Sequence, residues 1–401
     1  MKITVLGSTG SIGVNTLDVV RQHPHGWKIH SLVAGRNLEV LCSQILEFHP
    51  ERVVVADEVT LHELRSRLQD LTLPMKGWPD LAAGPRARVE AATASEVGFV
   101  MSAIVGVAGL EATYAAVKAR KRIGLANKEV LVASGGLVMD AVRECGTELI
   151  PVDSEHNGAH QCLRAGSREE VTRLLLTASG GPFRDTPRDD LWSVTPEQAL
   201  NHPTWKMGRR ITIDSATMMN KGFEVIEACW LFDLPPCQVD VVVHPQSSIH
   251  AMVEYNDGSV IAQMSATDMR MPIQYAMTYP ERRRAPVPRL DWTQPRTWNF
   301  MAPDLEKFRL LKLAYQAQEQ GGSATCTLNA ADEVAVEAFL QGRIPFPAIA
   351  STVEETLQRQ INSKPATIED VIGIDLASRD VARQVIAEEP WKSSPLTFLK
   401  R

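Results

Sequence analysis

Residues 2–20, KITVLGSTGSIGVNTLDVV, combine an apolar strand, a glycine-rich turn and the start of an amphipathic helix. Glycines at positions 7, 10 and 13 permit a tight turn and let the backbone approach a pyrophosphate at the helix N-terminus. The spacing is G-x-x-G-x-x-G rather than the usual G-x-G-x-x-G, so the motif alone carries little weight. Because it opens a strand–helix–strand pattern, it nevertheless predicts a dinucleotide-binding loop.

The alternation of strands and helices continues through the first 150 residues. Six segments rich in Val, Ile and Leu are typical of strands: KITVLG, KIHSLVAG, ERVVVA, GFVMSAIVG, RIGLAN and TELIPV. Helical patterns such as IGVNTLDVVRQHP and GLEATYAAVKARK separate several of them. This alternation predicts a parallel sheet with helices on both faces.

A different pattern follows Pro151. A helix is expected after DSEHNG, then the strands TRLLLTAS and VDVVVHP, while TIDSATMMNKGFEVIEACWLF suggests a strand end, a cap and a helix. The NDG turn at 256–258 predicts a hairpin, and five prolines within 280–303 suit an extended linker. The pattern is helical from about residue 304. We therefore predict an α/β protein with an N-terminal Rossmann-like parallel sheet, a central α+β catalytic domain and a C-terminal helical bundle.

Composition narrows the class of function. The chain has 401 residues, 44% hydrophobic and 22% charged, with a formal net charge of −6, which is ordinary for a globular protein of two or three domains. This charge argues against a nucleic-acid surface and favours small-molecule substrates. The six cysteines form no C-x-x-C pair, MKITVLGSTG enters a strand without a leader, and no apolar run could span a bilayer. We expect a cytoplasmic protein without membrane partners.

The end of the second predicted strand bears on cofactor choice. NAD-dependent enzymes place an acidic residue there for the ribose 2′-hydroxyl. Here the chain has Gly35, Arg36 and Asn37. A cation suits a 2′-phosphate, so we expect NADPH rather than NADH; the alternative is a surface arginine in a loop.

Acidic residues suggest a metal site. Asp153 and Glu155 end an apolar strand with i, i+2 spacing, which would put them on one side of the chain. Farther on, Asn220 and Glu224 share a helix face, with Glu227 one turn beyond. Three carboxylates can gather if a cation holds them, and oxygen ligands suit Mg²⁺ or Mn²⁺. The alternative is that each acid is separately solvated or ion-paired.

The spacing of His156 and His160 also resembles a zinc-protease helix. That motif needs Glu after the first His as general base, and Asn157 stands there instead. The metallohydrolase interpretation is therefore poor, and we assign His160 no role.

Polar residues in the central segment suggest a phosphate site. Ser179 precedes two glycines, Ser215 lies near a predicted helix start, and Asn220 and Lys221 follow. Hydroxyls, an amide, an ammonium and helix N–H groups suit a phosphate monoester, although each serine alone is more often a cap. The loop at 201–208, NHPTWKMG, is either anchored by its Trp and Met or forms a lid over substrate.

Eight segments closely resemble the 1-deoxy-D-xylulose 5-phosphate reductoisomerase family, in order and over essentially the whole chain: GSTGSIG, LANKE, PVDSEH, SGGPF, NHPTWKMG, SATMMNKGFE, VVVHPQS and TLNAADE. The resemblance implies NADPH- and metal-dependent rearrangement and reduction of 1-deoxy-D-xylulose 5-phosphate to 2-C-methyl-D-erythritol 4-phosphate, in non-mevalonate isoprenoid precursor synthesis. It also implies a lid loop and a homodimer.

The resemblance further implies roles for individual residues. The metal ligands would be Asp153, Glu155 and Glu224, holding Mg²⁺ or Mn²⁺, with Co²⁺ as a further candidate. The substrate contacts would be Lys128, Ser154, Glu155, Ser179, His202, Ser215, Asn220, Lys221 and Glu224, of which Lys128, Glu155, His202, Lys221 and Glu224 would be catalytic. The NADPH contacts would be Thr9, Gly10, Ser11, Ile12, Gly35, Arg36, Asn37, Asn127, Glu129 and Gly208. Glu227 would orient Lys221 or a water rather than touch the metal.

These expectations divide the chain into four parts: an NADPH-binding domain at 1–150, a catalytic and dimerisation domain at 151–285, a linker at 286–311 and a C-terminal helical domain at 312–401. Two other functions stay open. One is a simple NADP-dependent dehydrogenase of another sugar phosphate, with structural acids. The other is a non-catalytic ligand sensor, which should have lost one of the three carboxylates, and all three are present.

Overall fold

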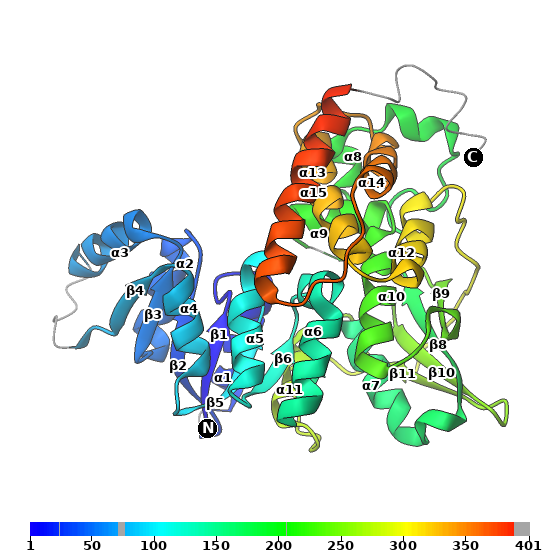
Figure 1. The fold of residues 1–401 in the computed structure, drawn as a ribbon. Coiled ribbons are helices and arrows are strands. Elements are labelled where there is room, and N and C mark those ends of the chain that lie inside the picture. Colours follow the sequence, from blue (N-terminus) through cyan, green and yellow to red (C-terminus); the bar gives the residue numbers. More distant parts are fainter. Residues whose placement is uncertain (24, 71–76, 206, 389–401) are drawn as a thin grey trace. The chain divides into compact units, whose positions relative to one another are not determined.

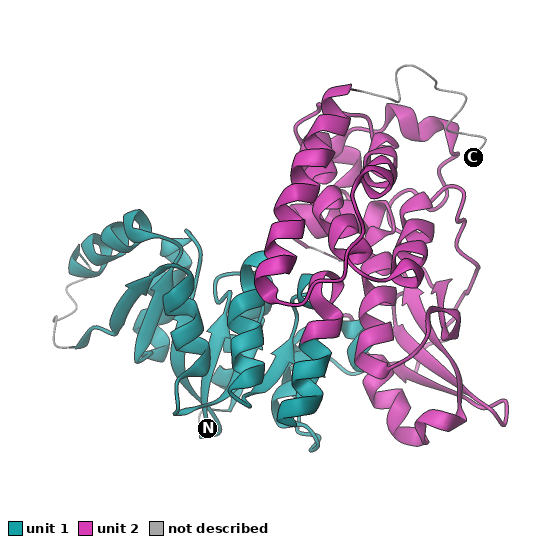
Figure 2. Ribbon diagram, in the orientation of Figure 1, with its two compact units in different colours: residues 1–130, 138–157, 268–289 teal, residues 131–137, 158–267, 290–401 magenta. Residues whose placement is uncertain are grey.

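The computed structural model describes residues 1–23, 25–70, 77–205 and 207–388 (Figure 1). The chain divides into two compact units (Figure 2). Unit 1 comprises residues 1–130, 138–157 and 268–289, and unit 2 comprises residues 131–137, 158–267 and 290–401. Within the described residues, each unit contains one sheet.

Unit 1 is built on a parallel seven-stranded sheet of order β4-β3-β2-β1-β5-β6-β7. Its strands are β1 (Lys2–Leu6), β2 (Lys28–Val33), β3 (Arg52–Val55), β4 (Asp80–Ala83), β5 (Val97–Ser102), β6 (Arg122–Leu125) and β7 (Leu149–Pro151). The six predicted strands are all present. The sequence DLAA of β4 was not anticipated because it lacks the β-branched residues that mark a strand.

Helices cover both faces of this sheet, as predicted. They are α1 (Ser11–Gln22), α2 (Leu38–Phe48), α3 (Glu58–Asp70), α4 (Gly84–Thr93), α5 (Leu110–Lys118), α6 (Glu129–Cys145) and α11 (Arg270–Thr278), with the 3₁₀ turn η2 (Val107–Gly109). Ile3 and Val5 of β1 share a buried cluster with residues of α1, α2, α3 and α11. Thr4 faces the opposite way and donates to the Ala91 carbonyl of α4, 2.8 Å away.

Unit 2 contains a mixed four-stranded sheet of order β11-β10-β8-β9. Its strands are β8 (Val171–Ala178), β9 (Val239–Val243), β10 (Ile249–Tyr255) and β11 (Val260–Met264). β8 and β9 are parallel, and β10 is antiparallel to β8 and β11. The predicted hairpin is therefore confirmed as β10–β11.

The helices of unit 2 supply its larger core. They are α7 (Ser154–Cys162), which begins in unit 1, α8 (Pro196–Ala199), α9 (Arg209–Ala216), α10 (Met219–Phe232), α12 (Arg309–Gln320), α13 (Ala324–Leu340), α14 (Ala348–Arg359) and α15 (Ile368–Glu388). Short 3₁₀ helices are η3 (Leu163–Ala165), η4 (Arg168–Glu170), η5 (Asp189–Ser193) and η6 (Pro236–Gln238). Helix α13 packs against α9, α12, α14 and α15, so the C-terminal helices form the predicted bundle.

Two local expectations are wrong. β7 ends at Pro151 and α7 begins at Ser154, so the helix does not follow DSEHNG but includes most of it. The segment that begins at Thr212 was expected to start with a strand end, yet residues 209–216 form α9. Its β-branched run ITI suggested a strand, but burial of Ile213 and Ala216 against the helical core overrides that propensity.

None of the described helices combines the length and apolar composition that crossing a bilayer requires.

Candidate active site

The glycine loop, residues 7–13, joins β1 to α1 where the strand order of the sheet reverses. Gly7 has φ +86°, and the N–H groups of Gly7 and Ser8 donate to the Val33 carbonyl at 2.8 and 2.9 Å. A Cβ on Gly13 would lie 2.3 Å from the Gly7 carbonyl oxygen, so a side chain there would collide with the loop backbone. The loop therefore needs glycine at both ends.

The N-terminus of α1 is suited to an anion. Gly10 occupies the N-cap position without a side-chain cap, and the first turn of α1 has no acidic residue. Thr9 and Ile12 are half-buried, and Gly10 and Ser11 are exposed. The backbone N–H groups and the helix dipole at this end favour a phosphate.

Arg36 follows β2, as expected. Its side chain is 81% exposed, and its guanidinium pairs with Asp57 at 3.0 Å. Asp57 accepts hydrogen bonds from the hydroxyl and N–H of Thr60, which together with Arg36 lower its pKa to about 2. Gly35 precedes Arg36, and Asn37 caps α2 by accepting from the Val40 N–H. An exposed ion pair of this kind contributes little stability, so Arg36 can turn toward a phosphate.

The role of Asp57 was not anticipated from the sequence. The signal for it is an Asp three residues before Thr60 at the start of a helix, a pattern typical of an N-cap.

Two further predicted cofactor residues follow β6. The Asn127 amide donates to the Gly106 carbonyl at 3.0 Å and accepts from the Val130 N–H at 3.3 Å. Glu129 is buried in the first turn of α6. Gly208 belongs to unit 2, where it occupies the N-cap position of α9.

Asp153 and Glu155 lie at the N-terminus of α7. The Glu155 N–H donates to a carboxylate oxygen of Asp153 at 3.2 Å, and the Ser154 hydroxyl donates to Glu155 at 2.8 Å. The expected strand-end alignment is therefore wrong: a helical first turn, rather than alternation along a strand, brings the two acids together. The helix dipole favours negative charge at this position.

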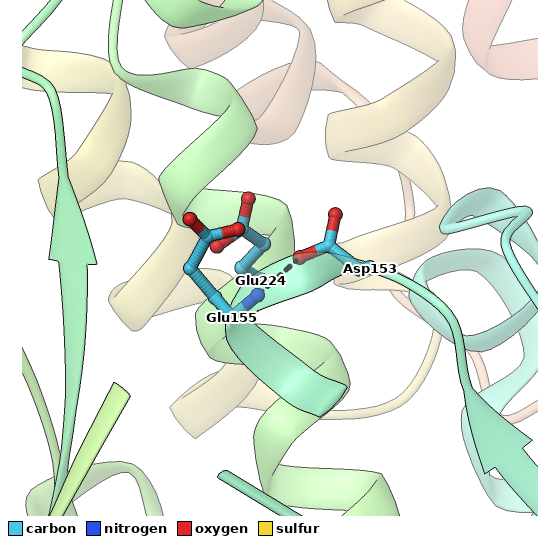
Figure 3. Close-up of side chains that lie close together, drawn as sticks. All are labelled: Asp153, Glu155 and Glu224. Atoms are coloured by element: carbon cyan, nitrogen blue, oxygen red, sulfur yellow. Dashed lines mark hydrogen bonds between the residues drawn. The ribbon is translucent and has the colours of Figure 1, made fainter. Parts of the chain in front are cut away.

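Glu224 joins these two residues. One carboxylate oxygen from each of Asp153, Glu155 and Glu224 lies within 4.8 Å of the others (Figure 3). Glu224 is fully buried on α10. Helices α7 and α10 are held together by their own packing, because Ala159 of α7 and Val225 of α10 share one buried cluster. We refer to these three acids as the acidic triad.

Two lysines offset the charge of the acidic triad. Lys128 forms an ion pair with Asp153, and Lys221 forms one with Glu224. The Asn220 amide also donates to Glu224 at 2.6 Å. Three converging carboxylates with two ammonium groups leave one negative charge, and this set of oxygen donors fits a hard dication such as Mg²⁺.

Other candidate ligands stay outside this group. Glu227 is buried one turn along α10 and is not a member of it. Neither His156 nor His160 belongs to a metal-ligand group among the described residues. Burial lowers the pKa of His160 to about 4, in keeping with a packed, neutral histidine.

A second cluster forms around His202. The Nε2 atom of His202 lies 3.1 Å from the Ser179 hydroxyl and 3.0 Å from the Ser215 hydroxyl. The Nδ1 atom faces the backbone N–H groups of Thr204 and Trp205, at 3.1 and 2.9 Å, and accepts from both. We call Ser179, His202 and Ser215 the serine–histidine cluster.

These contacts fix the protonation of His202. Since Nδ1 accepts from two N–H groups, the imidazole proton must lie on Nε2, which then donates to a serine hydroxyl. Burial lowers the pKa of His202, which also favours the neutral ring. The ring thereby joins the loop at 201–208, in which residue 206 lies outside the described part, to both serines.

Glycines let the two serine-bearing segments approach. Gly180 and Gly181 follow Ser179 with φ +84° and +66°, and the Gly181 N–H donates to the Ser179 hydroxyl at 3.2 Å. A Cβ on Gly181 would lie 2.6 Å from the Ser215 carbonyl oxygen. Of the predicted phosphate contacts, the structure brings Ser179 and Ser215 together, whereas Asn220 and Lys221 contact Glu224.

A parallel sheet with a glycine loop where its strand order reverses is typical of dinucleotide-dependent oxidoreductases of the Rossmann-like class. Family comparison is more specific. Residues 3–135 match the family described as 1-deoxy-D-xylulose 5-phosphate reductoisomerase, and residues 149–232 and 264–381 match two descriptions of its C-terminal domain. The chain belongs to this family and is an NADPH-dependent reductoisomerase.

Individual members of this family are similar to the chain over nearly its whole length. The 1-deoxy-D-xylulose 5-phosphate reductoisomerase of Solibacter usitatus is 67% identical over 96% of both chains, and that of Chlorobaculum tepidum is 49% identical over 96% of this chain and 99% of its own. The crystal structure of the Zymomonas mobilis enzyme with NADPH has a TM-score of 0.89 and 44% identity, covering 96% of this chain and 98% of that one. A reductoisomerase structure with NADPH, fosmidomycin and magnesium has a TM-score of 0.89 and 39% identity, with the same coverage.

The comparisons confirm the predicted family, fold class and cofactors, and they favour the reductoisomerase over the simple dehydrogenase.

Proposed function

We propose that Asp153, Glu155 and Glu224 are the ligands of the dication with which this enzyme converts 1-deoxy-D-xylulose 5-phosphate to 2-C-methyl-D-erythritol 4-phosphate. The supporting observation is the convergence of three carboxylate oxygens within 4.8 Å, next to two lysines. Mg²⁺ or Mn²⁺ suits this oxygen set, and Co²⁺ is a further candidate. Bound there, the dication would polarise the substrate carbonyl and stabilise the negative charge that develops as the carbon–carbon bond breaks.

The protein's own groups around the acidic triad would orient the substrate. Lys128 and Lys221 supply ammonium donors beside Asp153 and Glu224, where substrate oxygens would lie. Ser154 donates to Glu155 and so fixes the direction of that carboxylate. Glu224 and Lys221 are buried, which strengthens the charge interactions that these two residues make.

The serine–histidine cluster would bind the phosphate of the substrate. The Ser179 and Ser215 hydroxyls can donate to phosphate oxygens, and His202 can add its Nε2 proton. Asn220 and Lys221, at the start of α10, complete the predicted phosphate set. Because His202 also accepts from Thr204 and Trp205, phosphate binding would order the loop at 201–208.

NADPH would bind along the carboxyl edge of the parallel sheet. Thr9, Gly10, Ser11 and Ile12 would hold its pyrophosphate at α1, and Arg36 would hold the 2′-phosphate. Five further residues would complete the set of cofactor contacts: Gly35, Asn37, Asn127, Glu129 and Gly208.

We also propose a homodimer. β11 is an edge strand of the unit 2 sheet and exposes Val260 by 50% and Ile261 by 39%. An exposed apolar edge strand invites pairing with another chain. Sedimentation or light scattering should give twice the mass of one chain, and charged substitutions at Val260 and Ile261 should reduce it to one.

The remaining expectations concern cell compartment and domain limits. All six cysteines are free thiols, which suits the reducing cytoplasm. We propose the functional divisions 1–150, 151–285, 286–311 and 312–401; residues 389–401 of the last lie outside the described part.

The central experiment follows NADPH absorbance with 1-deoxy-D-xylulose 5-phosphate, before and after EDTA and after adding back Mg²⁺ or Mn²⁺. We expect turnover to disappear with EDTA and to return with either metal. NADPH affinity, measured by fluorescence titration without metal, should stay unchanged. Turnover that persists after chelation would refute the metal assignment.

A further inference from the structure

The side chain of Arg184 closes the loop that begins with Ser179. Ser179 follows directly after β8, and residues 179–184 have the sequence SGGPFR. The Nη1 atom of Arg184 donates a hydrogen bond to the Ser179 carbonyl oxygen at 3.1 Å. This contact joins the last residue of the loop to its first residue within unit 2.

The two glycines after Ser179 give this hydrogen bond its importance. Gly180 and Gly181 have φ +84° and +66°, a backbone region that other residues rarely occupy. Because glycine has more conformational freedom than any other residue, the segment after Ser179 needs contacts that hold it. The Gly181 N–H supplies one such contact, to the Ser179 hydroxyl at 3.2 Å, and Arg184 supplies a second.

The fold also leaves room for Arg184 at Gly180. A Cβ on Gly180 would lie 2.9 Å from the Cδ atom of Arg184 and 2.9 Å from the Cγ1 atom of Val243 in β9. The aliphatic stem of Arg184 therefore packs over a position where a larger residue would displace it. Arg184 is thus held by packing as well as by its hydrogen bond to Ser179.

Two neighbours orient the guanidinium of Arg184. Its Nε and Nη2 atoms donate to Oδ2 of Asp185 at 3.2 and 2.9 Å, which leaves Nη1 to donate to Ser179. Lys307, which precedes α12, donates to the Arg184 carbonyl oxygen at 2.8 Å. Because the side chain of Asp185 is 80% exposed, its ion pair adds little stability, and its main effect is on the orientation of the guanidinium.

The serine held in this way belongs to the serine–histidine cluster. The Ser179 hydroxyl lies 3.1 Å from the Nε2 atom of His202. A single torsion angle, χ1, separates the Ser179 backbone from this hydroxyl, so the backbone position determines where the hydroxyl can lie. A contact that fixes the Ser179 carbonyl therefore also fixes the hydroxyl.

We propose that Arg184 is a positioning residue that holds the Ser179 hydroxyl where it would bind the substrate phosphate. The inference rests on the proposed contact between Ser179 and this phosphate. Arg184 acts through the Ser179 carbonyl and is assigned no contact with the substrate. Loss of Arg184 should therefore weaken binding of the sugar phosphate and leave NADPH binding unchanged.

The first test compares Arg184→Met and Arg184→Lys with the control Arg188→Met. Methionine keeps an apolar stem without a donor, whereas lysine keeps the charge but lacks the planar fork that serves Ser179 and Asp185 together. We expect KM for 1-deoxy-D-xylulose 5-phosphate to rise about tenfold in Arg184→Met and about threefold in Arg184→Lys. KM for NADPH should stay within about twofold of the parent value.

Arg188→Met removes the same charge from another half-buried arginine of this segment and should behave like the parent. A lower Tm in Arg184→Met with an unchanged KM, or an equal rise of KM in Arg188→Met, would overturn the proposal. If Arg184→Met fails to fold, Arg184→Lys decides, and a parental KM for the sugar phosphate in that variant would overturn the proposal as well.

A double-mutant cycle tests whether Arg184 acts through Ser179. In a Ser179→Ala background, the hydroxyl that Arg184 positions is gone, so Arg184→Met should change KM for the sugar phosphate by less than about twofold. If Arg184→Met still raises this KM about tenfold, Arg184 acts independently of Ser179 and the inference fails.

Hydrogen exchange separates this inference from the assignment on which it rests. Peptides covering residues 179–184 of the substrate-free enzyme should exchange faster in Arg184→Met than in the parent or in Arg188→Met. If Ser179→Ala leaves KM for the sugar phosphate unchanged while this difference is observed, the phosphate assignment has failed and the contact of Arg184 with the loop stands. Parental exchange rates in Arg184→Met would show that Arg184 does not hold the loop.

Discussion

The glycine loop and the acidic triad are suited to charged ligands for different structural reasons. The loop offers backbone N–H groups at an exposed helix end and depends on missing side chains at Gly7 and Gly13. The triad gathers side-chain charges that are partly or fully buried and offsets them with two lysines. The first is a property of local backbone shape, and the second is a property of the folded chain.

This difference predicts different responses to mutation. A substitution in the acidic triad changes charge and leaves the backbone in place, so the chemical step should fail while cofactor binding survives. A substitution in the glycine loop moves backbone, so cofactor binding should weaken first. Kinetic and binding measurements on matched variants can separate the two.

The largest effect is expected for Glu224→Gln. The amide removes one ligand charge and leaves Lys221 with a weaker partner, so kcat should fall by at least about 10²-fold. NADPH affinity should stay within about twofold in fluorescence titrations. Glu319→Gln, an exposed helical glutamate, is the matched control and should behave like the parent. Near-parental turnover in Glu224→Gln would remove this residue from the metal site.

Gly13→Ala should have the next broadest effect, because it lowers both folding stability and NADPH affinity. The added Cβ would lie 2.3 Å from the Gly7 carbonyl oxygen and 2.5 Å from backbone atoms of Ser8, so the loop must shift. Overpacking of this kind destabilises by about 1–3 kcal/mol. We expect a lower Tm and NADPH affinity weakened about tenfold. Gly373→Ala, in α15 with no atom within 4 Å of the added Cβ, should leave NADPH affinity unchanged and should not lower Tm, because alanine favours the helix. Equal NADPH affinity in Gly13→Ala and the parent would show that the loop does not form the pyrophosphate site.

The same contrast explains what the sequence could predict. Glycine spacing and strand–helix alternation are local signals, and both predicted the parallel sheet correctly. The three members of the acidic triad were also anticipated, but the reason given for the first pair was wrong, because Glu155 lies in a helical turn. The length of the apolar run did not show where β7 ends.

Interactions between distant segments were beyond the sequence patterns. The ion pair of Arg210 with Glu333 joins residues more than a hundred positions apart, and the spacing of neither residue predicts it. Helix α9 was mistaken for a strand end because its ITI run has strand propensity, and only packing against α13 decides the outcome. Local pattern therefore predicted the strands and helices well and long-range side-chain networks poorly.

Arg36→Glu tests the proposed contact of the exposed Arg36 with the 2′-phosphate of NADPH. Losing one charge-assisted contact to the 2′-phosphate and gaining a repulsion should weaken NADPH binding about 10- to 100-fold. NADH, which lacks this phosphate, should bind as well as before, so the ratio of the two affinities is the measurement. Arg65→Glu, an equal charge change at an exposed position of α3, is the control. If both variants lose NADPH affinity equally, the net charge of unit 1 determines this affinity, rather than a specific contact of Arg36.

The smallest effect concerns the pH dependence of folding stability through His202. Its pKa in the folded protein lies below the ordinary 6.5, so the neutral ring contributes stability that is complete above 6.5. As pH falls below 6.5, the unfolded chain binds the proton first, and this contribution is lost until the folded-state pKa is reached. Protonation of Nδ1 would also break its two hydrogen bonds with Thr204 and Trp205. Urea unfolding of the parent and of His202→Asn at several pH values should give the shallower pH slope for the variant. Identical slopes would mean that His202 is not held neutral, and the donor role of its Nε2 proton toward Ser179 and Ser215 would fall with it.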